Sequence, residues 1–228
     1  MPAVRSSSFS SRLPWLLQTL GFCVLIGVTL FVSAGRVDLP FFWAYLIVCV
    51  VCFTVATFTI EPDLFRERIR PGGQPLKLRY YALLLPVVIH WIIAGLDVGR
   101  LHWSDTVPLA LQTLALVIFT GGLLLIARAM SVNRFFSSII RLQNDRGHHL
   151  VTAGPYRWVR HPGYLAGLMF CLASGIALGS WLALIPALFC VPLLLNRTIA
   201  EDRFLKANLT GYAEYAERVR YRWLPGIW

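Results

Sequence analysis

The chain has 228 residues, of which 57% are hydrophobic and only 14% are charged, and its mean hydropathy is +0.64. A water-soluble domain of this size carries about 25% charged residues to keep its surface solvated, so this composition excludes a soluble fold and predicts a surface that faces lipid. The net charge of +10 by itself suits a nucleic-acid partner, but the basic residues lie in short stretches between apolar runs, where anionic lipid headgroups attract them. We therefore expect a membrane and no nucleic acid as partner.

Six apolar runs predict membrane-spanning helices, because a helix rises about 1.5 Å per residue and must cross a hydrocarbon core about 30 Å thick. The runs cover residues 13–34, 41–60, 80–99, 108–130, 163–178 and 181–199. Only Gly179 and Ser180 separate the last two, which predicts a tight helical hairpin over 163–199. A sheet is excluded, because no ten-residue alternation is present and open strand edges are not tolerated in lipid. The predicted fold is all-α, a polytopic bundle of about six transmembrane helices.

The first run has a second interpretation as a secretory signal peptide, with Arg5 and Arg12 before the apolar stretch and small residues at 32–34 as a cleavage site. The bundle would then have five spans. The apolar stretch is longer than the usual 7–15 residues of such signals, which favours a retained helix.

The connections between the runs differ sharply in charge. Of the 21 Lys and Arg residues, 19 lie before the first run, in or beside the second and fourth connections, or from the end of the last run onward. Under the positive-inside rule this places both termini and the basic loops in the cytoplasm, and we expect an integral protein of a bacterial inner membrane. The chain divides into residues 1–130, with four spans and a basic loop at 61–79, and a catalytic region at 131–228.

Two cytoplasmic segments are predicted to lie at the membrane interface. In residues 131–146, four large apolar side chains recur at helical spacing between Arg134 and Arg141. After Glu201, an apolar stripe predicts an amphipathic C-terminal helix. The stripe consists of Leu205, Leu209, Tyr212, Ala216 and Val219.

Side chains suited to chemistry gather in residues 148–164 and 196–203. Arg197 and Glu201 are four residues apart and therefore share one helix face, where they can bind a zwitterion. A structural ion pair that fixes the last helix is the alternative, because a carboxylate at the membrane edge needs a cationic partner. Both interpretations remain open at this point.

The loop before the fifth run is shaped by two Gly/Pro pairs, at 154–155 and 162–163, which display Tyr156, Arg160 and His161 around a compact turn. Free backbone N–H groups at the start of the next helix, together with Arg160 and His161, predict an electropositive pocket for a carboxylate or phosphate.

Metal and disulfide sites are not expected. All five cysteines lie within apolar runs, and the pair Cys49 and Cys52 is interpreted as two buried small side chains. The histidines His148, His149 and His161 are close in sequence but lack the spacing of a metal-binding set.

Four features occur in order through the C-terminal part of the chain. They are LVTAGPY at 150–156, RHPGY at 160–164, Arg197 four residues before an acid, and the tail RVRYRWLPGIW at 218–228. Together they resemble the integral membrane methyltransferases that include isoprenylcysteine carboxyl methyltransferase and, more distantly, the phospholipid N-methyltransferases. The first 130 residues match only as hydrophobic spans.

The resemblance implies a cytoplasmic pocket for S-adenosylmethionine. The cofactor-contacting positions of the family are occupied here by Gln143, His148, His149, Leu150, Val151, Tyr156, His161, Tyr164 and Glu201. Arg197 falls at the position of a substrate-contacting arginine, and Arg160 at that of a second arginine near the reacting centre, so Arg160, Arg197 and Glu201 are the expected catalytic residues. The chain departs from the paired glutamates of the family at Asp202.

The resemblance leaves the methyl acceptor open. A prenylcysteine carboxylate needs only positioning, for which Arg197 is suited, whereas a phospholipid amine needs a base such as Glu201. An NADPH-dependent sterol or enone reductase and a non-enzymatic scaffold or transporter are rival interpretations. In the latter, His90 and Asp97 would mark a polar pathway; otherwise His90 is a satisfied helix contact and Asp97 lies with Arg100 at the outer surface.

Overall fold

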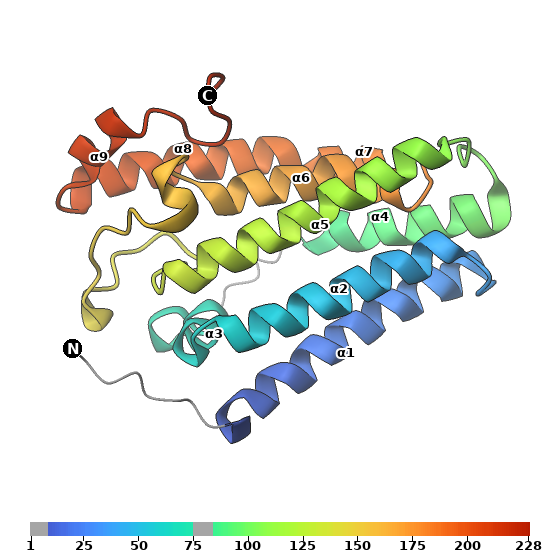
Figure 1. Cartoon of the computed structure of the whole chain (residues 1–228), viewed down its shortest axis with the longest axis horizontal. Coiled ribbons are helices and arrows are strands. Elements are labelled where there is room, and N and C mark those ends of the chain that lie inside the picture. Colours follow the sequence, from blue (N-terminus) through green and yellow to red (C-terminus); the bar gives the residue numbers. More distant parts are fainter. Residues whose placement is uncertain (1–8, 75–83) are drawn as a thin grey trace.

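The computed structural model describes residues 9–74 and 84–228, and over these residues the chain is helical with no strand (Figure 1). The longer helices run side by side through the bundle. They are α1 (Phe9–Ala34), α2 (Pro40–Thr59), α4 (Leu84–Leu96), α5 (Leu109–Val132), α6 (Pro162–Ala177) and α8 (Cys190–Asn208). The predicted all-α membrane bundle is confirmed.

Five helical segments of the described residues are long and apolar enough to cross a membrane. They are Arg12–Ala34, Pro40–Thr59, Leu84–Leu101, Leu109–Val132 and Leu184–Asn208. The run predicted at 163–178 forms α6, whose 16 residues extend only about 24 Å, less than the hydrocarbon thickness. The count of about six spans thus becomes five spans and one shorter apolar helix.

The predicted hairpin at 163–199 is present, and its second arm is longer than expected. Gly179, with φ +87°, follows α6, and the chain returns through α7 (Leu184–Leu188) into α8. Because α8 continues to Asn208, Arg197 and Glu201 lie inside a helix with further turns beyond them.

Close packing of α5 against α6 brings the two parts of the chain together. A Cβ added to Gly122 would lie 3.2 Å from the Met169 side chain and 3.3 Å from the Ala166 carbonyl oxygen. The first run belongs to the same bundle, because α1 packs against α2 and α4 and buries Ile26 and Leu30 in the core. The first run is therefore a helix of the bundle in this structure, and its retention stays a prediction.

The basic connections share one end of the bundle. Figure 1 shows α3 (Pro62–Ile69), the segment 133–161 and α9 (Tyr212–Arg218) together at the left, while the turn between α1 and α2 and the connection before α5 lie at the right. Large apolar side chains such as Val24, Ile47 and Val117 are more than half exposed along the spans, as expected for surfaces that face lipid. The protein is therefore an integral membrane protein.

Two polar residues of the third span are held inside the protein. His90 is fully buried and contacts Val87 O and, through Nε2 at 2.8 Å, Ser174 Oγ, so it is a satisfied helix contact. The placement of Asp97 at the outer surface was wrong, because its carboxylate is fully buried and accepts hydrogen bonds from Ser104 and Ser180.

The interfacial segment predicted at 131–146 continues α5 to Val132 and then forms a loop, so the helical spacing of its apolar side chains does not produce a second helix. After α5 the backbone is irregular except for a short 3-10 turn at Asn144–Arg146. The Asn133 side chain accepts a hydrogen bond from Phe135 N, which competes with helix continuation. We call residues 135–142 the strap, because they extend from the end of α5 across to α3.

The C-terminal amphipathic stripe packs as predicted but is divided between two helices. Gly211, with φ +80°, separates the end of α8 from α9. The five stripe residues gather with Tyr215 and Leu150 in one apolar cluster. This cluster fixes the C-terminal segment against the loop that follows the strap.

Candidate active site

A cavity of about 450 Å³ opens at the end of the bundle where α3, the strap and α9 gather. The strap, the loop at 148–164, α6, α8 and α9 all contribute to its walls. Of the predicted site residues, those that line it are His148, His149, Leu150, Val151, Tyr156, Arg160, His161, Tyr164, Arg197 and Glu201. The fold thus brings together residues that are up to 53 positions apart in the sequence.

Gln143 is the predicted residue that lies elsewhere. It is fully buried, donates a hydrogen bond from Nε2 to Phe135 O at 2.7 Å, and accepts one from Arg146. Its observed interactions therefore hold the strap, and its contact with a cofactor stays a prediction.

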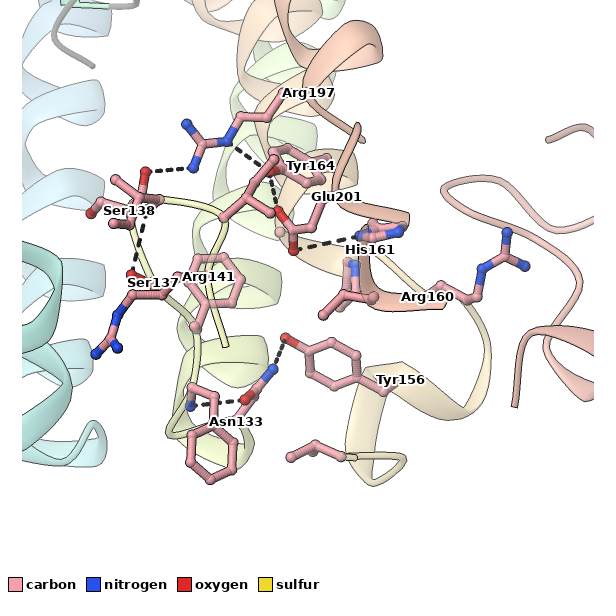
Figure 2. Close-up of a pocket in the computed structure, with 18 of the residues that line it drawn as sticks. Asn133, Ser137, Ser138, Arg141, Tyr156, Arg160, His161, Tyr164, Arg197 and Glu201 are labelled. Carbon is pink, nitrogen blue, oxygen red and sulfur yellow. Dashed lines mark hydrogen bonds and ion pairs between the residues drawn. The ribbon is translucent and has the colours of Figure 1, made fainter. Parts of the chain in front are cut away.

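A chain of hydrogen bonds connects Arg197 to Glu201 through Tyr164 (Figure 2). The Tyr164 hydroxyl donates to Glu201 Oε2 at 2.6 Å and accepts from Arg197 Nε at 2.8 Å. In the described structure the two charged residues form no direct ion pair, although they are one turn apart on α8. A direct pair between these two residues is therefore absent, and among the described residues the cationic partner within ion-pair distance of Glu201 is His161.

The other contacts of Arg197 and Glu201 leave both charged groups at the cavity. Arg197 Nη2 donates to the strap carbonyl Ser138 O at 2.5 Å, and Glu201 Oε1 lies 3.9 Å from His161 Nδ1. Figure 2 shows Tyr164, Glu201 and His161 converging from α6, α8 and the preceding loop. The cavity wall therefore presents an anionic and a cationic group a few ångströms apart.

Asp202, the acid whose role the sequence left open, faces away from Glu201 into the protein. It is 1% exposed and accepts hydrogen bonds from Arg160 at 2.8 and 3.2 Å, Tyr212 at 3.0 Å and Arg222 at 3.2 Å. His161 Nε2 lies 3.3 Å from the same carboxylate. Asp202 thereby joins α8, the RHPGY loop, α9 and the C-terminal tail.

Arg160 is oriented by this network. Besides Asp202, its guanidinium donates to the carbonyl oxygens of Val219 and Arg220 at 2.7 and 2.8 Å, and Figure 2 shows it turned away from Glu201. The backbone N–H of Arg160 is likewise occupied by Tyr221 O. A direct catalytic role for Arg160 stays a prediction, and its placement favours a structural role instead.

The other end of the cavity is apolar with few polar atoms. Leu150 and Val151 line it beside Tyr156, whose hydroxyl accepts a hydrogen bond from Asn133 Nδ2 at 3.1 Å. Burial raises the pKa of Tyr156, so this hydroxyl stays neutral at physiological pH. Burial and the nearby cationic groups lower the pKa of His148, which keeps that imidazole uncharged and able to accept a hydrogen bond.

Sequence reasoning missed several lining residues, among them the polar Arg68 on α3, Asn133 and Ser138. Arg68 had been counted only as part of a basic loop that orients the chain. The positive charge of this loop is the feature that could have pointed to Arg68, because the loop lies at the same end of the bundle as the motifs at 148–164. Within the described residues, no group of three or more His, Cys, Asp or Glu is placed to hold a metal ion.

Comparison with known proteins agrees with this arrangement. Residues 113–207 match the model of the isoprenylcysteine carboxyl methyltransferase (ICMT) family, which covers α6, α8 and most of the cavity wall. The cobalt-zinc-cadmium resistance protein CzcN of Cupriavidus metallidurans is 32% identical over 137 residues, 58% of this chain and 58% of that protein.

Two eukaryotic relatives carry the family name. A probable protein-S-isoprenylcysteine O-methyltransferase of Oryza sativa subsp. indica is 26% identical over 105 residues, 45% of this chain and 55% of that protein. The protein-S-isoprenylcysteine O-methyltransferase of Schizosaccharomyces pombe is 30% identical over 111 residues, 47% of each chain. The match thus spans about half the length of these relatives. It confirms the resemblance seen in the sequence: residues 113–207 of this chain are similar to the ICMT family.

Proposed function

We propose that this protein is an integral membrane methyltransferase that uses S-adenosylmethionine to methylate the carboxylate of a lipophilic acceptor, such as a prenylcysteine-like compound. The observation that carries this proposal is the convergence of Tyr156, His161, Tyr164 and Glu201 on one cavity at the basic end of the membrane bundle. A volume of about 450 Å³ lies in the range of small-molecule sites.

The chemistry of the lining fits the proposed cofactor. Glu201 can accept hydrogen bonds from an ammonium group, and His161 beside it can donate to a carboxylate, so the pair suits the amino-acid end of the molecule. Leu150, Val151 and Tyr156 give an adenine ring an apolar wall. When bound, S-adenosylmethionine supplies an electrophilic methyl group.

The residues of the chain then act by binding and positioning. An acceptor carboxylate is ionised at neutral pH and needs no general base. Arg197 holds it by charge-assisted hydrogen bonds, and Tyr164 keeps Arg197 and Glu201 at a set separation. The strap and α9 form part of the cavity wall, and closure of the site to water by the bound acceptor would favour in-line transfer between two aligned groups.

The site is proposed to face the cytoplasm of a bacterial cell. The basic connections lie at the same end as the cavity, and the positive-inside rule assigns that end to the cytoplasmic leaflet. A lipophilic acceptor would reach the cavity from the bilayer between apolar side chains such as Ile126 and Leu194.

The test is methyl transfer from labelled S-adenosylmethionine by the purified protein to a panel of acceptors. The panel contains a farnesylated cysteine analogue, phosphatidylethanolamine and a plain fatty acid. We expect transfer to the farnesylated carboxylate; transfer to phosphatidylethanolamine alone would instead identify a phospholipid N-methyltransferase. Binding of NADPH in place of S-adenosylmethionine would overturn the proposal in favour of a reductase.

The relative CzcN is named for metal resistance, and so is the nickel-cobalt-cadmium resistance protein NccN of Alcaligenes xylosoxydans xylosoxydans. That no metal takes part here stays a prediction. A chelator in the same assay tests it: unchanged transfer supports a metal-free reaction, and a loss restored by one of these metals contradicts it.

A further inference from the structure

The arginines of the cavity differ in how their charge is neutralised. Arg141 is paired with Glu67 at 2.9 Å and Asp145 at 2.8 Å, and Arg160 with Asp202. Arg197 has hydroxyl and carbonyl acceptors but no carboxylate within ion-pair distance among the described residues. The charge of that arginine is therefore available to a ligand.

Arg68 also lacks a carboxylate partner among the described residues, and it reaches the cavity from a different part of the chain. It lies on α3, lines the cavity, and forms no ion pair with any described carboxylate. Within the described residues its side chain donates one long hydrogen bond, from Nη1 to Phe136 O at 3.4 Å. Its Cζ lies 5.2 Å from the Phe136 ring centroid. A guanidinium has five N–H donors, so most of the donor capacity of Arg68 is unused.

The unused donors are not sealed in the protein interior. No fully buried side-chain nitrogen or oxygen in the described part of the chain lacks a partner, so the remaining Arg68 nitrogens retain accessible surface. Since Arg68 lines the cavity, part of that surface is open to a ligand there.

Arg68 and Arg197 bracket the strap. Arg68 contacts the carbonyl oxygen of Phe136, and Arg197 that of Ser138, two residues further on. Burial, followed by the positive charge of Arg197, lowers the pKa of Arg68 to about 10, so Arg68 lies within electrostatic range of Arg197 and still carries its charge at neutral pH. Two guanidinium groups that contact carbonyl oxygens two residues apart and lack a carboxylate partner repel one another until an anion enters between them.

We propose that Arg68 and Arg197 together form an oxyanion-binding site that holds the carboxylate or phosphate of the lipophilic acceptor. The inference rests on the proposed function and deepens it, because it assigns a recognition residue outside the matched region 113–207 and gives the acceptor an anionic group. Guanidinium groups bind both oxyanions by paired N–H donors. A neutral acceptor lacks the charge that relieves the repulsion and binds more weakly.

The test measures equilibrium binding of three probes to the full-length protein in lipid nanodiscs. The probes are a farnesylated cysteine analogue with a free carboxylate, its neutral amide, and dodecyl phosphate. Arg68→Gln removes the charge, Arg68→Lys keeps it without the paired donors, and Arg66→Gln is the control, an exposed arginine of the same helix. Binding of labelled S-adenosylmethionine is measured for every variant as a check on the fold.

We expect Arg68→Gln to weaken binding of an anionic probe at least tenfold while changing the amide and S-adenosylmethionine less than twofold. Arg68→Lys should retain part of the affinity, and Arg66→Gln should resemble the unmodified protein. Loss for the carboxylate alone identifies an acid acceptor, loss for the phosphate alone identifies a phospholipid, and loss for both supports the shared oxyanion site.

Unchanged binding of both anions in Arg68→Gln, or an equal loss of the amide, would overturn the inference. Should the unmodified protein fail to bind S-adenosylmethionine or to transfer methyl groups, the proposed function fails. The difference between the anionic and neutral probes would still decide the role of Arg68.

Discussion

Two polar regions of the bundle, one buried and one at the cavity, use their polar atoms differently. In the middle of the bundle, Tyr45, His90, Trp91 and Ser174 form a closed set, in which Ser174 lies 2.8 Å from both Tyr45 and His90, and Trp91 donates to Tyr45. At the basic end, Glu201, Arg197 and Arg68 keep hydrogen-bonding capacity directed at a cavity. A polar cluster that satisfies itself stabilises the fold, whereas one with capacity left over is suited to bind a ligand.

Asp202 gives the strongest test of this comparison, because it borders the cavity but belongs to the self-satisfied kind. Asp202→Asn leaves the buried Arg160 without its anion, and we expect a loss of about 3–5 kcal/mol in the free energy of unfolding. Thermal unfolding of the detergent-solubilised protein measures the change. A variant with unchanged stability and lost cofactor binding would place Asp202 in the ligand site instead.

Glu201→Gln should show the opposite behaviour. Since the Glu201 carboxylate faces the cavity, we expect about 100-fold weaker binding of S-adenosylmethionine with little change in thermal stability. The control is Glu217→Gln, an exposed acid on α9. Equal binding by Glu201→Gln and the control would contradict both the cofactor proposal and the distinction between the two regions.

Ser174→Ala tests the closed polar set in the middle of the bundle. It removes the hydroxyl that Tyr45 and His90 share, at an expected cost of about 1–3 kcal/mol. Because the cluster lies away from the cavity lining, KM for cofactor and acceptor should stay unchanged. A variant that keeps its melting temperature but alters KM would show that the middle cluster takes part in ligand binding.

The smallest effect is expected for acid sensitivity of the strap. Burial of Glu67 raises its pKa, but hydrogen bonds from Arg141, Gly72 N and Ser137 outweigh this, so the pKa lies below its ordinary value. A carboxylate whose pKa is lowered in the folded state stabilises the fold at pH values above its ordinary pKa, here 4.5. This contribution is lost as the pH falls through the folded-state pKa. Glu67→Gln should remove about 1 kcal/mol of the free energy of unfolding that is lost on acidification. Acid unfolding followed by tryptophan fluorescence measures the change. An identical acid transition in the variant would rule out this ion pair as a determinant of strap stability.

Much of the fold was predictable because lipid imposes simple requirements on a sequence. Runs of apolar residues near 20 in number became helices, and the basic connections came to one end. The helical spacing of Phe135, Phe136, Ile139 and Ile140 would suit a helix in the strap, while Asn133 and the contacts with α3 select an irregular backbone. Periodicity records which side chains are apolar, but it does not record competing hydrogen bonds.

The sequence alone determined that this is a helical membrane protein with a basic end, and that the motifs from 148 to 201 lie there, because hydropathy and charge act on each segment locally. Only the tertiary structure decided that Glu201 faces the cavity while Asp202 faces the interior, since adjacent positions on a helix point about 100° apart. It also decided that Arg68 approaches Arg197 across 129 positions of sequence, because such a meeting depends on how helices pack and not on the spacing within any one of them.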